Sequence, residues 1–281
     1  MSSIVDDLKM QYQFGGVAFR LIFWNVLCFV VSLLFFYDFQ LGVFNFPSWI
    51  ALSSDPNVLI TKPWTIISYA FFHHGVGHLF FNMMVLHFTS MLFLTFFNSK
   101  QFIGLYLLSA LFSGVAFVVG YYFLQMNSSM VGASGAIMAI LVATTTYRPL
   151  MTVRLLFFGN VKLWHITAVI LVLDFMQFKI ENTGGHIAHL AGAFFGFIFI
   201  KLLQNGWDLS RILNNPLNKS KRTPFKKVHK NYSKPTSKPS SRIVVKDKTQ
   251  QQIDEILDKI SQSGYDCLTQ EEKEFLFKAG K

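Results

Sequence analysis

The chain has 281 residues, of which 52% are hydrophobic and only 14% are charged. Soluble domains carry about 25% charged residues, so this composition excludes an ordinary soluble domain and indicates a membrane protein. The formal net charge is +10, and the two cysteines, Cys28 and Cys267, give neither a disulfide framework nor a metal-ligand spacing.

Apolar segments of the length that crosses a bilayer, about 20 residues, recur along most of the chain. We predict membrane spans at 17–37, 78–97, 101–123, 130–147, 161–178 and 186–204. The first apolar run is too long for the core of a signal peptide, so we expect it to remain as a span. The predicted fold is an all-α polytopic membrane protein, with a cytoplasmic N-terminus at 1–14 and a six-helix membrane domain at 15–204.

The stretch at 38–77 separates the first two spans. It is apolar and aromatic, but Pro47, Pro56 and Pro63 interrupt it. Such a segment is too apolar for a solvated loop and too broken for a span. We therefore expect an interfacial or partly inserted loop that contains short amphipathic helices.

Positively charged residues set the expected orientation of the spans. With a cytoplasmic N-terminus, the inner loops hold Lys100, Arg148, Arg154 and Lys162, followed by the basic tail. The outer loops then hold Lys62 and Lys179 beside Asp38, Asp55 and Glu181. We expect both termini in the cytoplasm of a prokaryote, with the core in the inner membrane. In this orientation the second, fourth and sixth spans all run inward.

Basic residues dominate the segment that follows the last span. From Arg211 to Lys248 there are twelve Lys or Arg residues and one acidic residue, Asp247. We predict a flexible basic linker at 205–247. Because the chain is already held at a membrane, contact with anionic lipids is the favoured role of this charge, and nucleic-acid binding is not expected.

The last residues, 248–281, again show helical patterning. Ile253, Ile256, Leu257 and Ile260 recur at helical spacing, and Thr269 with Glu272 forms a capping-box pattern ahead of a second apolar group. Gly264 separates the two segments. We predict a small cytoplasmic helical hairpin that serves as an interaction module for a partner the sequence does not identify.

Polar residues inside spans are costly to bury and tend to be functional. Ser134 in the fourth span, His189 in the sixth, and His78 and Asn82 in the second all lie a short way from the predicted outer end. His78 and Asn82 are four residues apart and so share a helix face. Because these spans run in one direction, the four residues lie at similar depth, which predicts a single site.

The residue types in this site fit nucleophilic catalysis. A serine hydroxyl needs an adjacent base, usually histidine, so Ser134 and His189 are the predicted nucleophile and base. Small residues would let the two spans approach closely: Gly135 and Ala139 on one, Ala188, Gly192 and Gly196 on the other. The predicted oxyanion donors are the Ser134 amide and the side chains of Asn82 and His78, and Gly132 would allow a tight turn before the serine.

At "GASGA" and "AHLAGAFFG" the chain resembles the rhomboid family of intramembrane serine proteases. The family motif G-x-S-G is matched at Gly132–Gly135, H-x-x-G-x-x-x-G at His189–Gly196, and H-x-x-x-N at His78–Asn82. The resemblance covers about residues 15–204. It implies a six-helix core, a Ser–His dyad and transmembrane proteins as substrates. We expect no metal or cofactor, because the sequence shows no cluster of metal ligands. The resemblance also implies lateral substrate entry between the second and fifth spans.

Other polar residues have several interpretations. The histidine motif and the glycine face favour His189 over His186 as the base, and we expect His186 in the aqueous mouth. The family carries a further histidine at the position of His73, whose role stays open. Asp174 is expected at the membrane interface and not in a triad, because the family works through a dyad. His87 and His165 are expected to be structural.

The chain departs from the family pattern at three places. The family often has an aromatic residue at the position of Met138, an arginine at that of Thr65, and an acidic residue around 96–98. Two alternative functions also remain: a catalytically silent relative that binds transmembrane clients, and a transporter. The intact Ser134 and His189 oppose the first alternative, and the lack of evident repeats or charged, broken spans opposes the second.

Overall fold

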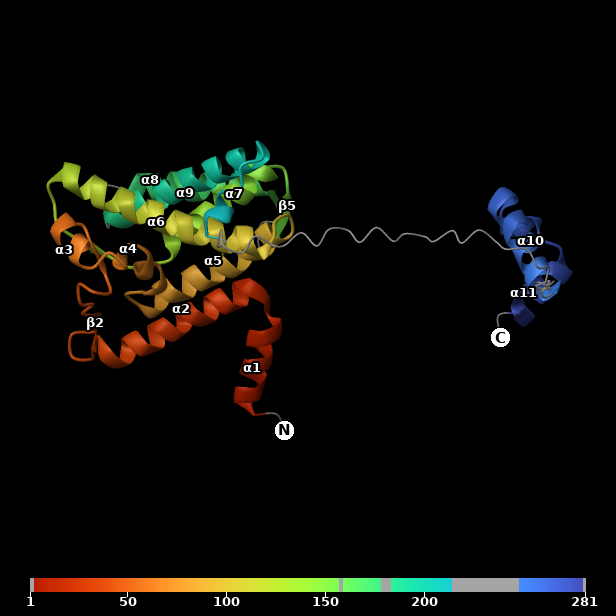
Figure 1. Ribbon diagram of the computed structural model, residues 1–281, viewed down its shortest axis with the longest axis horizontal. Coiled ribbons are helices and arrows are strands. Elements are labelled where there is room, and N and C mark those ends of the chain that lie inside the picture. The colour runs from red at the N-terminus through yellow and green to blue at the C-terminus, as the bar shows by residue number, and fades with distance from the viewer. Residues whose placement is uncertain (1–2, 157–158, 178–182, 214–247, 280–281) are drawn as a thin grey trace, which may run out of the picture. The chain divides into compact units, whose positions relative to one another are not determined.

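The computed structural model describes residues 3–156, 159–177, 183–213 and 248–279, which divide into two compact units, Met1–Ser220 and Lys221–Lys281 (Figure 1). The helices are α1 (Ile4–Phe14), α2 (Gly16–Phe35), α3 (Pro56–Thr61), α4 (Thr65–Ser68), α5 (Val76–Leu94), α6 (Ser99–Leu124), α7 (Ser134–Tyr147), α8 (Leu163–Gln177), α9 (Thr183–Gln204), α10 (Lys248–Ser263) and α11 (Gln270–Ala279). Three 3-10 helices, η1 (Tyr69–Phe71), η2 (Leu209–Ile212) and η3 (Tyr265–Cys267), accompany them.

Within the described residues, six short strands form three antiparallel pairs. The strands are β1 (Tyr37–Asp38), β2 (Val43–Phe44), β3 (Leu52–Ser53), β4 (Ser129–Met130), β5 (Thr152–Leu155) and β6 (Gly159–Lys162). They pair as β1 with β2, β3 with β4, and β5 with β6. An all-α fold was therefore too strict a prediction, although the chain is mostly helical.

Four helices, α2, α5, α6 and α9, are long and apolar enough to cross a membrane, and α7 and α8 are shorter apolar helices. Many large apolar side chains on these helices are exposed, including Phe35, Phe80 and Phe123. Such exposure fits a surface that faces lipid, where apolar side chains incur no hydration cost. These observations support an integral membrane protein.

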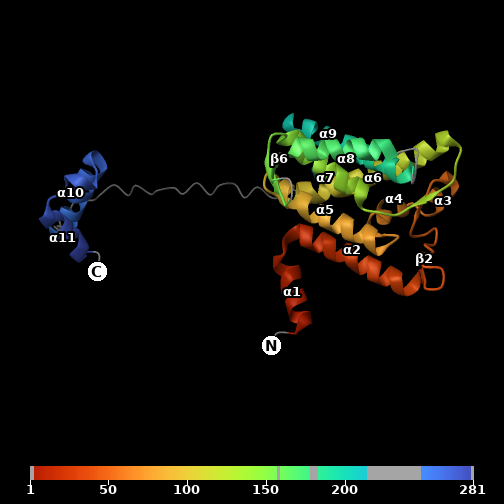
Figure 2. The ribbon, with the colours of Figure 1, turned by 180° about the vertical axis from the view of Figure 1, so that it is seen from behind.

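Helix α7 is the central helix of the first unit, and Figure 2 shows it between α5 and α8. All its residues from Gly135 to Thr144 are buried. The predicted span began at residue 130, but the helix begins at Ser134, because Met130 pairs with Leu52 between β4 and β3. A helix of 14 residues is only about 21 Å long. The non-helical segment before it is tolerated because its backbone groups form hydrogen bonds with neighbouring protein.

Helices α7 and α9 pack backbone against backbone. A Cβ atom added at Gly192 would lie 2.0 Å from the carbonyl oxygen of Gly135, and one at Gly196 would lie 2.2 Å from that of Ala139. Larger residues would hold the helices apart, as is general for close helix packing in membranes. The predicted role of the small residues on these two helices is therefore confirmed.

We predict that Gly192→Ala lowers the free energy of unfolding by about 3 kcal/mol, because backbone must move to admit the methyl group. The matched control is Gly77→Ala, where an added Cβ meets nothing within 4 Å. The control should leave stability unchanged or raise it by up to about 1 kcal/mol. Reversible unfolding in mixed micelles measures both variants. Equal stabilities for the two would contradict this account of the α7–α9 contact.

The segment between α2 and α5 is fixed to the helical core by buried tyrosines. The Tyr69 hydroxyl donates to the carbonyl of Ala110 at 2.9 Å, and the Tyr106 hydroxyl donates to that of Ala70 at 3.0 Å. Both tyrosines are at most 2% exposed. Short helices were predicted in this segment, and α3, α4 and η1 confirm them; β1, β2 and β3 were not foreseen.

Two segments outside the predicted membrane domain are ordered. Residues 4–14 form α1, which begins at a capping box between Ser3 and Asp6. At the other end, residues 205–213 were assigned to the flexible linker, but Ser210 in η2 is buried against Gly104 of α6. The packed part of the chain thus extends past residue 204. The remainder of the predicted linker, 214–247, lies outside the described residues.

The second unit consists of α10, η3 and α11. Thr269 and Glu272 form the predicted capping box, with the Thr269 amide donating to Glu272 at 2.9 Å. Lys259 of α10 pairs with Glu272 at 2.5 Å, and this contact lowers the pKa of Glu272 and raises that of Lys259. Ile256 and Leu268 form its small buried core. The two predicted helices are present.

Candidate functional site

Ser134 is the first residue of α7, and the strand pair β3–β4 holds the segment that leads to it. Between strand and helix, Gly132 has a φ of +144°, which favours glycine. Its amide donates to the carbonyl of Tyr69 at 3.0 Å. Gly132 thus adopts, just before the serine, a backbone conformation that other residues rarely take. Ser134 follows at a helix N-terminus, where the first backbone N–H groups have no intrahelical partner.

His189 lies on α9 opposite Ser134. The distance between His189 Nε2 and Ser134 Oγ is 2.6 Å, which is hydrogen-bonding distance. The close approach of α7 and α9 allows this contact, because the glycines of α9 let its backbone reach that of α7. Both side chains are partly exposed. The structure thus brings together the two residues that the sequence selected as nucleophile and base.

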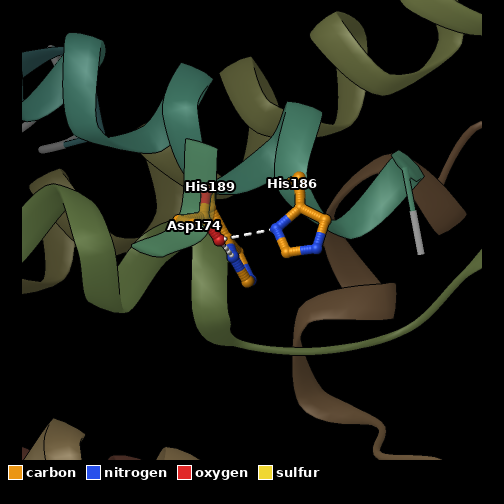
Figure 3. A group of neighbouring side chains, drawn as sticks. All are labelled: Asp174, His186 and His189. Atoms are coloured by element: carbon orange, nitrogen blue, oxygen red, sulfur yellow. Dashed lines mark hydrogen bonds and ion pairs between the residues drawn. The ribbon is translucent and has the colours of Figure 1, made fainter. Parts of the chain in front are cut away.

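Asp174 of α8 and His186 of α9 also join this group, as Figure 3 shows. Asp174 Oδ1 lies 2.7 Å from Nδ1 of His189 and 2.7 Å from Nδ1 of His186. Asp174 is 9% exposed and His186 is 8% exposed. The sequence analysis did not predict that Asp174 contacts both of these histidines. Spacing along the chain could not reveal the contact, because it depends on how α8 packs against α9.

His78 and Asn82 project from α5 toward the same site. A Cβ atom added at Gly132 would lie 3.2 Å from His78 Nε2 and 3.6 Å from Ser134 Oγ, so the imidazole and the hydroxyl both flank this glycine. Asn82 is buried, and among the described residues its Nδ2 has no hydrogen-bond partner. An unpaired buried amide costs free energy, which a ligand accepting its hydrogen bond would recover.

Two further histidines adjoin His78. The ring of His73 is fully buried 5.0 Å from that of His78, and the exposed His74 ring is 4.3 Å away. Burial, reinforced by His78 and His74, lowers the pKa of His73 from 6.5 to about 3, so this residue is neutral at physiological pH. His74 was not singled out in the sequence, where only its position next to His73 could have drawn attention.

Two cavities meet at Ser134, Asn82 and His189. One, of about 630 Å³, is lined by Phe46, which follows β2, and by Met130 of β4 among other residues. The other, of about 410 Å³, lies among α5, α7, α8 and α9 and includes Met138. The serine is therefore accessible both from the loops and from the α5–α8 side.

The two other histidines within the described residues, His87 and His165, are exposed, and neither lines these cavities. The side chains of one cluster could together hold a metal ion. Its ligand atoms, from Asp174, His186 and His189, lie within 4.8 Å of one another, and such a set suits a divalent ion such as Zn²⁺. The same atoms already satisfy one another by hydrogen bonds, which accounts for their proximity without an ion.

Comparison with known families identifies the family of the chain. The family model described as Rhomboid domain matches residues 61–205, just over half of the chain. Residues 244–278 match a family of unknown function, DUF6576. No curated protein matches the chain significantly. The Rhomboid match includes Ser134, His189 and the close contact of α7 with α9, and the chain belongs to the rhomboid family.

Proposed function

We propose that the chain is an intramembrane serine endopeptidase that cleaves other membrane proteins in or near their transmembrane segments. The observation that carries this proposal is the 2.6 Å contact between Ser134 Oγ and His189 Nε2 inside an apolar helical bundle. A serine hydroxyl in contact with an imidazole is the arrangement that activates serine nucleophiles. Membership of the rhomboid family supports the same reaction class.

The proposed reaction proceeds through an acyl-enzyme. Ser134 Oγ attacks the peptide carbonyl while His189 Nε2 takes the hydroxyl proton. His189 then gives this proton to the leaving amine, and the carbon–nitrogen bond breaks. A water molecule, deprotonated by His189, hydrolyses the ester and regenerates the serine. The partial exposure of both residues supports access by water.

The developing oxyanion requires donors beside the serine. The N-terminus of α7 supplies the Ser134 amide and the positive end of the helix dipole. Asn82 Nδ2, buried without a partner among the described residues, is a second donor. His78, which flanks Gly132 and Ser134, is a third. Donors aimed at developing charge are usually the largest electrostatic contribution to acyl transfer.

The two cavities suit the two reactants of the proposed hydrolysis, the substrate segment and water. We propose that a transmembrane segment reaches Ser134 through the cavity on the α5–α8 side, which agrees with the lateral entry that the family implies. Water then enters through the cavity beneath the loops. We further propose six spans with both termini in the cytoplasm of a prokaryote, attraction of the basic linker to anionic lipids, and recruitment of a partner by the C-terminal helices.

The test is cleavage by the purified full-length chain in liposomes. The substrates are single-span proteins with a small residue at the tested bond and helix-destabilising residues after it. We expect two fragments, whose new termini mass spectrometry locates in or near the span. Binding without cleavage across a panel of such substrates would refute the proposal and favour the catalytically silent alternative; passage of a labelled solute into the liposomes without cleavage would favour a transporter.

A further inference from the structure

A serine–histidine dyad does not require the carboxylate of Asp174, which lies between the two histidines of α9. Asp174 Oδ1 lies 2.7 Å from the Nδ1 atoms of both His186 and His189, and the carboxylate is buried at the contact of α8 with α9. A buried carboxylate is costly unless it is hydrogen-bonded or paired. The hydrogen bonds to His186 and His189 offset this cost, and they connect the carboxylate to the proposed base.

The hydrogen bonds define which ring nitrogens carry protons. A carboxylate oxygen accepts hydrogen bonds and donates none, so the Nδ1 atoms of His186 and His189 are the donors. Neutral His189 then has no proton on Nε2, and this atom faces Ser134 Oγ at 2.6 Å. The aspartate thus selects the tautomer in which His189 can take the serine proton.

His186 in turn orients the aspartate. His186 and His189 are three residues apart on α9 and so lie on one helix face, from which both rings reach the same oxygen (Figure 3). The other oxygen, Asp174 Oδ2, is buried and has no hydrogen-bond partner within the described ranges. The two imidazoles are therefore the groups that fix the rotation of this carboxylate.

We propose that Asp174 is a positioning residue for His189, and that His186 holds Asp174 in the orientation this requires. The inference rests on the proposed function. Ser134 is then activated through a chain of three groups instead of two. When His189 takes the serine proton, the resulting cation lies beside a fixed anion in an apolar environment, where their attraction is much stronger than in water.

The experiment measures kcat and KM for a transmembrane substrate in liposomes, and the rate at which a fluorophosphonate probe labels Ser134. For Asp174→Asn we expect kcat and the labelling rate to fall about ten- to a hundredfold with KM within twofold of wild type, because the charge is lost while the cavities are kept. This is less than the roughly 10⁴-fold effect known for a triad aspartate, since the Ser134–His189 contact remains.

His186→Leu tests the second part of the proposal. It removes the donor at similar volume and should lower kcat by less than Asp174→Asn. In the Asp174→Asn background it should lower kcat no further, because His186 acts through Asp174. Independent, multiplying losses would overturn the role given to His186.

The matched control is Thr167→Val. Thr167 is also a buried polar residue of α8, and its Oγ1 contacts Thr145 Oγ1 of α7 at 2.6 Å. This variant loosens α8 without touching His189, so its kcat should equal that of wild type. A loss equal to that of Asp174→Asn would assign Asp174 a merely structural role.

If Asp174→Asn fails to fold, Asp174→Glu carries the test, because it keeps the charge but displaces the oxygen and should lower kcat at unchanged KM. Wild-type kcat in the folded aspartate variant would overturn the inference and leave the proposed function intact. A wild-type protein that neither cleaves nor reacts with the probe at Ser134 would overturn the proposed function itself.

Discussion

Replacing Ser134 or His189 by alanine is expected to lower kcat by about 10⁴- to 10⁶-fold, and replacing both should lower it no further. The reason is that the hydroxyl and the imidazole act as one unit: without the base the serine is not activated, and without the serine the base has no proton to take. Their 2.6 Å contact carries this expectation. Fragment formation in liposomes, followed over days for the slow variants, measures the loss.

The controls for the single and double variants of Ser134 and His189 are matched by residue type. Ser109→Ala removes a buried serine hydroxyl that bonds to the carbonyl of Leu105 in α6, and His165→Ala removes an exposed histidine of α8. Both should keep wild-type kcat. Losses that multiply in the double variant Ser134→Ala/His189→Ala would show that the two residues act separately, which would be incompatible with the proposed mechanism.

Replacing Asn82 by alanine is expected to lower kcat by about 10²- to 10³-fold, the usual effect of removing one oxyanion donor. KM should change little, because the donor meets full negative charge only in the transition state. Asn82 Nδ2 is free to serve, since within the described part of the chain it has no other partner. Initial rates over a range of substrate densities in the bilayer separate kcat from KM.

Two comparisons make the Asn82 prediction specific. Asn82→Asp keeps the shape but loses the amide donor, so it should be as slow as alanine. Asn25→Ala removes another buried asparagine, whose Nδ2 donates to the carbonyl of Leu21 in α2. It should reduce stability and leave kcat unchanged. An Asn82→Asp variant with wild-type kcat would remove Asn82 from the oxyanion site.

The sequence predicted the Ser134–His189 pair because both partners are set by features local to a helix. Each lies near the end of an apolar run, and each is followed by small residues at helical spacing. Such spacing fixes which face carries the polar group, and small residues indicate that the faces meet. The membrane class followed from composition in the same way.

What the sequence could not supply depends on contacts between distant segments. The start of α7 at Ser134 requires the pairing of residues 52–53 with 129–130, which no local pattern encodes. The contact of Asp174 with His186 and His189 requires the rotation of α8 about its axis relative to α9. An isolated aspartate near the end of an apolar helix is equally compatible with the interface, where the sequence analysis placed it.

His186 and His189 lie on the same helix, α9, as the glycines that contact α7. Inserting one residue between His189 and Gly192 would turn the histidine by about 100° and shift it by about 1.5 Å relative to that contact. Where backbone meets backbone, no side chain can repack to absorb such a change. We therefore expect an insertion or deletion between His189 and Gly192 to separate His189 from Ser134.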